Sequence, residues 1–237
     1  MTEPPPIIIT IDGAAATGKS TIAHRLARRL GLEFLDTGAM YRAAALLAIE
    51  EGIDPDDGER LAEAIRRVGM SFDFSEDPPA LFLGDRPVGD RIRDMDVSEI
   101  VSVVAAQRPV REAMVTAQRR VAGEHPRLVT EGRDQGSVVF PDATAHFFLT
   151  AAAEVRAMRR VHQLAESGKD VPLDEIVRDI EARDRLDSTR ADGPLMQPTD
   201  AVVIDTAALT IPEIVDRLAA VVEQRAAEQS GSAGARP

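Results

Sequence analysis

The sequence contains no cysteine and almost no lysine, and each absence limits its chemistry. Without cysteine there can be no disulfide, no thiolate-bound metal and no cysteine nucleophile. This composition fits a reducing compartment, so we expect a cytoplasmic protein. Of the 28 basic residues only Lys19 and Lys169 are lysines, which makes arginine the default cation. An arginine by itself is therefore weak evidence for a phosphate site, whereas a lysine is an unusual choice.

Long apolar runs and a positive net charge are also missing. A membrane-spanning helix needs about 18 or more consecutive apolar residues, and the sequence has no such run, so we expect no membrane partner. The first residues, MTEPPP, lack the basic and apolar regions of a signal peptide. The net charge of -12 opposes binding to a phosphate backbone, so we expect no nucleic-acid partner. Hydrophobic residues make up 44% of the chain, enough for a core without metals or disulfides.

Hydrophobic patterning predicts strands that alternate with amphipathic helices. Short apolar runs predict strands, and helical periodicity predicts helices between them. Such alternation indicates an α/β fold, with a central parallel sheet and helices on both faces. Residues 70–90 differ, because MSFDF and ALFLGDRPV surround turn signals and predict a small inserted antiparallel sheet. The predicted strands of the main sheet are 7–12, 33–38, 127–132, 145–150 and 201–206, and the predicted helices are 19–31, 39–52, 56–69, 97–106, 109–123, 151–167, 173–190 and 211–227.

Residues 13–20 fit the phosphate-binding pattern G-x-x-x-x-G-K-[ST] between a predicted strand and a predicted helix. Lys19 is expected to reach the β- and γ-phosphates, and the Ser20 hydroxyl to bind Mg²⁺. A glycine-rich turn that only caps a helix is the alternative. The pattern predicts a nucleoside-triphosphate site and leaves the phosphate acceptor open. The predicted ATP-binding residues are Gly13, Ala14, Ala15, Ala16, Thr17, Gly18, Lys19, Ser20 and Thr21.

Further polar groups could bind an acceptor. Arg183 and Asp187 are i, i+4 neighbours and Arg190 follows three residues later, so all three share a helix face. A salt-bridged solvent face is the alternative for this group. Arg133 and Asp134 directly follow a predicted strand, where ligands bind in parallel sheets. Thr37 and Arg42 surround the start of a helix, and Ser102 and Arg111, taken separately, could be surface residues.

Taken together, these segments resemble a known family, the bacterial cytidylate (CMP) kinases among the P-loop nucleoside monophosphate kinases. The resemblance covers about residues 7 to 222 and is more specific than the phosphate-binding pattern. The matching blocks, in family order, are ITIDGAAATGKST, FLDTGAMYRAAA, VSEIVSVVAAQRPVREAM, EGRDQGSVVFPDA, AEVRAMRR, RDRLDSTRADGPL and DAVVIDT.

The resemblance implies a P-loop kinase fold and a domain organisation. It implies one domain over residues 7–227, with a monophosphate-binding insert at about 56–105 and a lid at about 156–175. Residues 1–6 would be a flexible N-terminus and residues 228–237 a disordered tail. The implied reaction is transfer of the γ-phosphate of ATP to CMP or dCMP by a monomer, with Mg²⁺ and without a covalent intermediate.

The resemblance also implies roles for individual residues. It does not decide which of the lid arginines Arg156, Arg159 and Arg160 is catalytic, and we take Arg159 as the candidate. The implied catalytic residues are Lys19, Arg133, Arg190 and Arg159. The implied CMP ligands are Ser102, Arg111 and Asp134 for cytosine, Arg183 and Asp187 for the pentose, and Arg42, Arg133 and Arg190 with Thr37 for the phosphate.

The chemistry of CMP agrees with these residue types. A carboxylate at Asp134 suits the cytosine amine, and uracil would present an acceptor there, a mismatch worth about 1–3 kcal/mol. The acceptor phosphate has a second pKa of about 6, so it needs no general base at neutral pH. The sequence departs from the family pattern at Gln135, at Asp192–Gly193 and at Ala151–Ala153.

Two other functions fit part of the sequence. One is a P-loop kinase for a small alcohol, similar to shikimate kinases, with Asp36 or Asp134 as a base. The other is a nucleotide-sensing P-loop protein without catalytic activity. The presence of Lys19, Ser20 and the acceptor arginines argues against the second.

Overall fold

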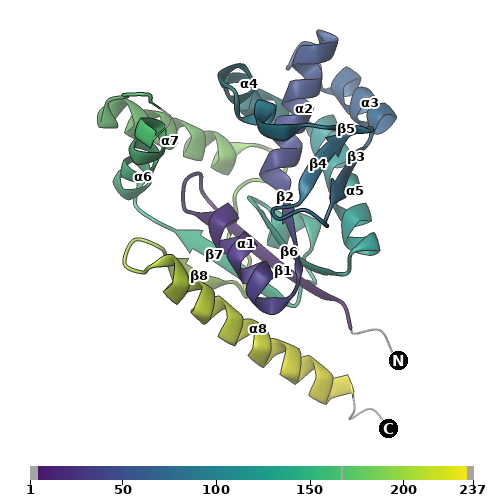
Figure 1. The fold of residues 1–237 in the computed structure, drawn as a ribbon, viewed down its shortest axis with the longest axis vertical. Helices are drawn as coiled ribbons and strands as arrows, with labels where there is room; N and C mark the ends of the chain where they lie inside the picture. The colour runs from purple at the N-terminus through teal and green to yellow at the C-terminus, as the bar shows by residue number, and fades with distance from the viewer. Residues whose placement is uncertain (1–4, 167, 234–237) are drawn as a thin grey trace. The chain divides into compact units, whose positions relative to one another are not determined.

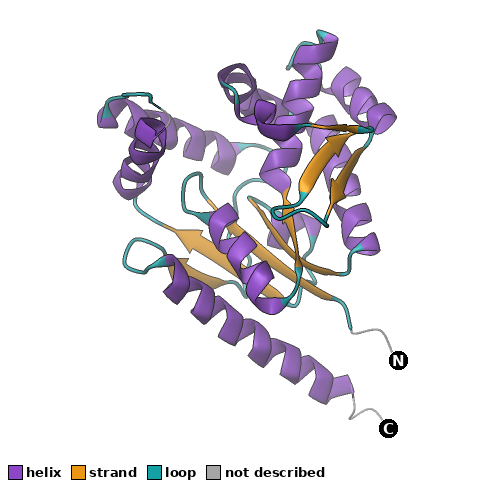
Figure 2. Ribbon diagram, in the orientation of Figure 1, coloured by secondary structure: helices purple, strands orange, loops and turns teal. Residues whose placement is uncertain are grey.

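The computed structural model describes residues 5–166 and 168–233. Its main sheet has the strand order β2-β6-β1-β7-β8, and β7 runs parallel to both β1 and β8. Helices flank this sheet, so the predicted α/β fold class is confirmed (Figure 2). The strands are β1 (Ile7–Gly13), β2 (Glu33–Asp36), β6 (Arg127–Gly132), β7 (Ala145–Thr150) and β8 (Val202–Asp205).

The chain forms two compact units. The first comprises the described residues up to Leu32 and from Val129 onward, and the second comprises Glu33–Leu128. The predicted insert at 56–105 falls within the second unit. The single-domain boundaries, the insert and the lid remain predictions.

The first unit is built around the buried strand β1. Its β-branched residues Ile9 and Ile11 are fully buried, as expected for a strand with neighbours on both sides. Helix α1 (Lys19–Leu30) buries one apolar face and ends at Gly31, whose φ of 63° favours glycine. Helix α8 (Ile211–Ala233) packs beside α1 (Figure 1).

Helices α6 (Ala153–Glu166) and α7 (Leu173–Thr189) form a hairpin within the first unit (Figure 1). Ala157, Ile176 and Ile180 form its buried cluster. Ala16 of the phosphate-binding segment packs against the same cluster. The hairpin therefore contacts the loop that is predicted to bind ATP.

The second unit contains a helical layer and the small antiparallel sheet predicted at 70–90. The sheet order is β3-β4-β5, and Met70 of β3 lies opposite Leu83 of β4. Buried Met40, Leu61 and Met114 contribute core side chains from three helices. The elements are α2 (Thr37–Glu51), α3 (Gly58–Val68), β3 (Met70–Asp73), β4 (Ala80–Leu83), β5 (Arg86–Pro87), the 3₁₀-helix η1 (Gly89–Arg93), α4 (Met95–Ala106) and α5 (Arg108–Glu124).

The structure differs from the sequence-based prediction at several places. Thr37 and Gly38, predicted to end a strand, begin helix α2, and the 3₁₀-helix η1 was not predicted. A one-turn π-helix, η2 (Gln135–Val139), occupies a segment for which no element was predicted. Helix α8 continues through Ala233, so residues 228–233 of the predicted tail are helical. Glu228 and Gln229 are good helix formers and favour the start of this extension, whereas Ser230, Gly231 and Ser232 do not. Residues 234–237 of the predicted tail and 1–4 of the predicted flexible N-terminus lie outside the described residues.

Within residues 5–166 and 168–233, no helix has both the length and the apolar character needed to cross a membrane.

Candidate active site

The phosphate-binding loop joins β1 to α1 in the first unit, as predicted. Gly13 has φ 151°, and a Cβ at this position would collide with the carbonyl oxygen of Leu149. Ala16 has φ 59°, an unusual left-handed conformation for a residue with a side chain. Thr17 Oγ1 donates to the Ala14 carbonyl at 3.0 Å. The loop thus has a defined, tightly turned backbone, as a phosphate site needs.

Lys19 begins α1 and is almost fully buried. Its Nζ donates to the Ala14 carbonyl at 2.8 Å. Burial and the positive charge of Arg133 lower the pKa of Lys19 to about 7, although Glu131 and Asp12 act in the opposite direction. A phosphate beside Nζ would favour the charged form, so binding of an anion is expected to protonate this lysine.

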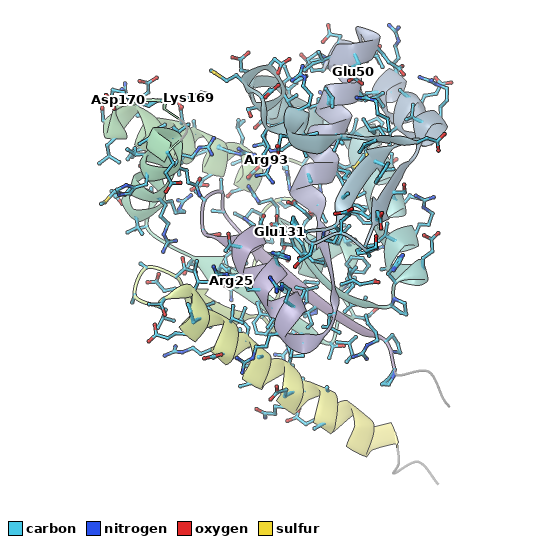
Figure 3. All side chains as sticks on the ribbon, viewed as in Figure 1. Arg25, Glu50, Arg93, Glu131, Lys169 and Asp170 are labelled. Carbon is cyan, nitrogen blue, oxygen red and sulfur yellow. The ribbon has the colours of Figure 1, made fainter. Side chains whose placement is uncertain are left out.

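Ser20 and Glu131 provide neighbouring oxygen atoms at the start of α1. Ser20 Oγ donates to Glu131 Oε1 at 2.6 Å. Glu131, labelled in Figure 3, is the penultimate residue of the buried strand β6. Mg²⁺ takes oxygen ligands and commonly uses one or two protein groups together with waters and substrate phosphates. The described residues contain no cluster of three or more potential metal ligands. A hydroxyl and one carboxylate therefore suit a nucleotide-bound Mg²⁺.

The structure brings together three of the predicted acceptor residues. Arg133 Nε donates to Asp187 Oδ2 at 2.8 Å, and Arg190 Nη1 lies 3.6 Å from Asp187 Oδ1. The Asp187 and Arg190 side chains are only 14% and 10% exposed, so they do not form the solvent face considered as the alternative. Burial would raise the pKa of Asp187, but Arg133, Arg183 and Arg190 hold it below its usual value. The cluster is cationic overall and suits a phosphate.

Asp134 is buried in the turn that follows β6. Its backbone carbonyl accepts from the Val138 and Val139 amides, which closes the π-helix. Gln135, the departure from the family pattern, is also buried, and its Oε1 accepts from Thr130 Oγ1 at 2.9 Å. A polar side chain is thus tolerated at this position because β6 supplies a partner for it.

The three lid arginines have different environments. Arg156 is buried, forms a two-point ion pair with Asp184 and donates to the Ala15 carbonyl at 3.1 Å. Arg159 donates to the carbonyl and hydroxyl of Thr206 at 2.6 and 3.0 Å. Arg160 is exposed. Arg156 therefore ties the hairpin to the phosphate-binding loop, whereas the catalytic assignment of Arg159 remains a prediction.

The remaining predicted ligands lie in the second unit. Arg42 Nη1 donates to Ser98 Oγ at 2.9 Å and to the Ile92 carbonyl at 3.3 Å. Arg111 is only 4% exposed, so it is not the surface residue considered as an alternative. Its guanidinium lies 5.8 Å from the centre of the Tyr41 ring. Thr37 is buried at the start of α2, and Ser102 is half-buried on α4.

Asp36, the alternative base for a small-alcohol kinase, caps α2. Its side chain accepts from the Ala39 amide at 2.8 Å. This bond explains the residue as a helix N-cap, a role in which aspartate is common.

Sequence reasoning missed Asp12 and Glu131, which both come from strands of the first unit. Asp12 Oδ1 and Oδ2 accept from the Gln135 and Gly136 amides at 2.8 and 2.7 Å. Both carboxylates end apolar strand runs next to glycines, Gly13 and Gly132. A charged residue at the carboxyl end of a parallel strand was the signal that could have identified them.

The strand, phosphate-binding loop and helix, set in a parallel α/β sheet beside a group of arginines, define a P-loop phosphotransferase. A family model described as cytidylate kinase matches residues 9–224. The cytidylate kinase of Rhodococcus opacus (strain B4) is 44% identical over 221 residues, which cover 92% of this chain and 96% of that protein. The cytidylate kinase of Caldanaerobacter subterraneus subsp. tengcongensis is 44% identical over 210 residues, covering 89% and 92%.

The chain therefore belongs to the cytidylate kinase family, and it is a nucleoside monophosphate kinase. Among solved structures, an uncharacterized protein from Eubacterium ventriosum ATCC 27560 is similar with a TM-score of 0.50. The two sequences are 11% identical, and the match covers 92% of this chain and 99% of the other. This likeness concerns the fold alone.

Proposed function

We propose that the protein transfers the γ-phosphate of ATP to CMP and dCMP, giving ADP and CDP or dCDP. The observation that carries the proposal is the Arg133–Asp187–Arg190 cluster, because these are residues that the family resemblance assigns to the acceptor nucleotide. Next to burial, the positive charge of Arg133 is the main cause that lowers the pKa of Lys19, so a proposed acceptor cation acts electrostatically on the donor loop.

In the proposed reaction, an acceptor phosphate oxygen attacks the γ-phosphorus of ATP. The bond from that phosphorus to the β–γ bridging oxygen breaks, and ADP leaves without a covalent enzyme intermediate. The acceptor is already mostly a dianion at neutral pH, so the protein needs no general base. Catalysis then depends on positioning and on neutralising charge in the transition state.

Each proposed group has one role in this reaction. Lys19 and the amides of the loop hold the donor phosphates, and Arg133, Arg190 and Arg42 hold the acceptor phosphate. Mg²⁺, when bound, neutralises charge on the transferred phosphoryl group. Ser20 and Glu131 are the residues whose oxygens would hold it. Arg159 is the proposed lid contribution.

Cytosine recognition is proposed for Ser102, Arg111 and Asp134, and pentose recognition for Arg183 and Asp187. The burial of Arg111 and Asp134 supports specificity, since a buried polar group discriminates strongly against a ligand that cannot pair with it.

The test is an assay of ADP formation with ATP, Mg²⁺ and each nucleoside monophosphate in turn. We expect rapid ADP formation with CMP and dCMP, and slower formation with UMP. Shikimate and a no-acceptor reaction serve as controls for the small-alcohol and nucleotide-sensing alternatives. Absence of CMP-dependent ADP formation would falsify the proposed function.

A further inference from the structure

The buried carboxylate of Asp12 is not explained by phosphate transfer itself. Asp12 is the last residue before Gly13 and is fully buried. Both of its oxygens accept backbone amides of the π-helix η2, from Gln135 at 2.8 Å and from Gly136 at 2.7 Å. Asp12, on the strand that leads into the phosphate-binding loop, therefore accepts the first two amides of η2, directly after Arg133 and Asp134.

Gly136, in this turn, is packed too closely to leave room for a side chain. A Cβ at Gly136 would lie 2.6 Å from His146 Nδ1, 2.8 Å from Pro198 Cγ and 2.9 Å from Thr10 Oγ1. Such distances are shorter than van der Waals contact, so any side chain here would displace the turn. The close packing of Gly136 and the two bonds to Asp12 act on the same backbone segment.

We propose that Asp12 is a positioning residue for the acceptor. Its two hydrogen bonds fix the Arg133–Asp134 turn on the strand that leads into the phosphate-binding loop. Arg133 and Asp134 are thereby held for CMP before the nucleotide arrives, which avoids an ordering cost on binding. The inference rests on the proposed function, because it takes CMP as the ligand of this turn.

Asp12→Asn is the sharpest test, because it keeps the size of the side chain. The two backbone N–H groups bond to different oxygens of Asp12, so the amide oxygen keeps one of these bonds and the amide nitrogen faces the other N–H as a second donor. We expect the KM for CMP to rise about 10- to 100-fold, as for loss of a hydrogen bond to a charged group, while the KM for ATP changes less than about threefold. The CMP-over-UMP preference should narrow as well.

Thr150→Val is the matched control. It removes a side-chain bond elsewhere in the same sheet, from Thr150 Oγ1 to the Ile204 carbonyl at 3.5 Å, and leaves in place both amide bonds of Asp12 and the side chains around Gly136. We expect a small loss of stability without a selective change in the KM for CMP. A rise of both KM values together in Asp12→Asn, or the same CMP-selective rise in Thr150→Val, would show a general packing effect and overturn the inference.

Gly136→Ala perturbs the same turn without changing Asp12. It tests the positioning role if Asp12→Asn does not fold. Its Cβ should displace the turn and produce the same selective rise in the KM for CMP. Wild-type kinetics in a folded variant would overturn the inference, as would failure of both variants to fold, which would assign the bonds to folding alone. If the wild-type protein does not use CMP, the proposed function fails instead, so the two failures are distinguishable.

Discussion

The loop after β1 and the turn after β6 both follow buried strands of the first unit, and both contain glycines. In the loop, Gly13 and Gly18 allow a backbone whose amides are suited to phosphate, so the main chain is the expected ligand. In the turn, the amides of Gln135 and Gly136 are already bonded to Asp12. Here the side chains of Arg133 and Asp134 remain for recognition. In the proposed function, the loop would therefore bind phosphate through its backbone, whereas the turn fixes its backbone so that its side chains would bind CMP.

The largest expected effect comes from the loop. Lys19→Ala should lower kcat about 10³-fold, because it removes a cation placed for charge that develops in the transition state. CMP affinity, measured by calorimetry without ATP, should change less than about threefold. Arg25→Ala, an exposed cation on the same helix, is the control and should retain activity (Figure 3). Near-normal turnover in Lys19→Ala would contradict the role proposed for Lys19 in phosphate transfer.

A substitution in the turn should weaken the binding of CMP and leave the ATP site nearly unchanged. Asp134→Ala should weaken CMP binding about 10- to 100-fold and leave the KM for ATP within about threefold, because the cytosine amine loses a charged acceptor. The ratio of kcat/KM values for CMP and UMP should fall. Asp142→Ala, an exposed carboxylate further along the same segment, is the matched control. An equal loss for CMP and UMP would mean that Asp134 does not contact the base.

Proton uptake on ATP binding tests the ionisation of Lys19 in the loop. The pKa of Lys19 is about 7 without a ligand, so at pH 8 this lysine is mostly neutral. An anionic nucleotide favours the ammonium form, and binding should therefore take up nearly one proton at pH 8 and less at pH 6. Calorimetry of ATP binding in buffers with different ionisation enthalpies measures this quantity.

Asp12 is the other group to consider in that measurement. Burial raises its pKa to about 7, although the amides of Gly136 and Gln135 and the charge of Lys19 oppose this effect. It too could take up a proton when an anion binds. Uptake that persists in Lys19→Ala would assign the proton to Asp12 rather than to the loop.

The smallest effect is expected inside the turn. Thr130→Val removes the buried hydrogen bond to the Gln135 side chain. The free energy of unfolding should fall by about 1 kcal/mol, and the KM for CMP should rise no more than about threefold. Thr116→Val removes an exposed bond to the Glu112 carbonyl and should cost less in a denaturation experiment. An equal loss of unfolding free energy in Thr130→Val and Thr116→Val would indicate that the bond from Thr130 to Gln135 adds no more stability than an exposed bond.

The sequence predicted the phosphate-binding loop and most elements because these depend on local signals. Gly13, Gly18 and Lys19 stand at fixed spacings, and the apolar runs of β1 and β7 are contiguous. The π-helix carries no such signal, because it is stabilised by the distant residue Asp12. The pairing of Arg133 with Asp187 joins positions 54 residues apart, so helical spacing could group Asp187 with Arg190 but not with Arg133.

The separation between Asp12 and its partners also has a consequence for synthesis of the chain. Asp12 is 123 residues before Gln135, and β7, the parallel neighbour of β1, begins only at Ala145. The second unit, Glu33–Leu128, is made in between. A ribosome therefore completes β1 long before the segments that cover it are made. Ile9 and Ile11, which are buried in the folded protein, are not covered by these segments until then. Nascent chains that end before about residue 132 contain neither β6 nor β7, the two neighbours of β1, so they expose an unpaired apolar strand of the kind that chaperones bind.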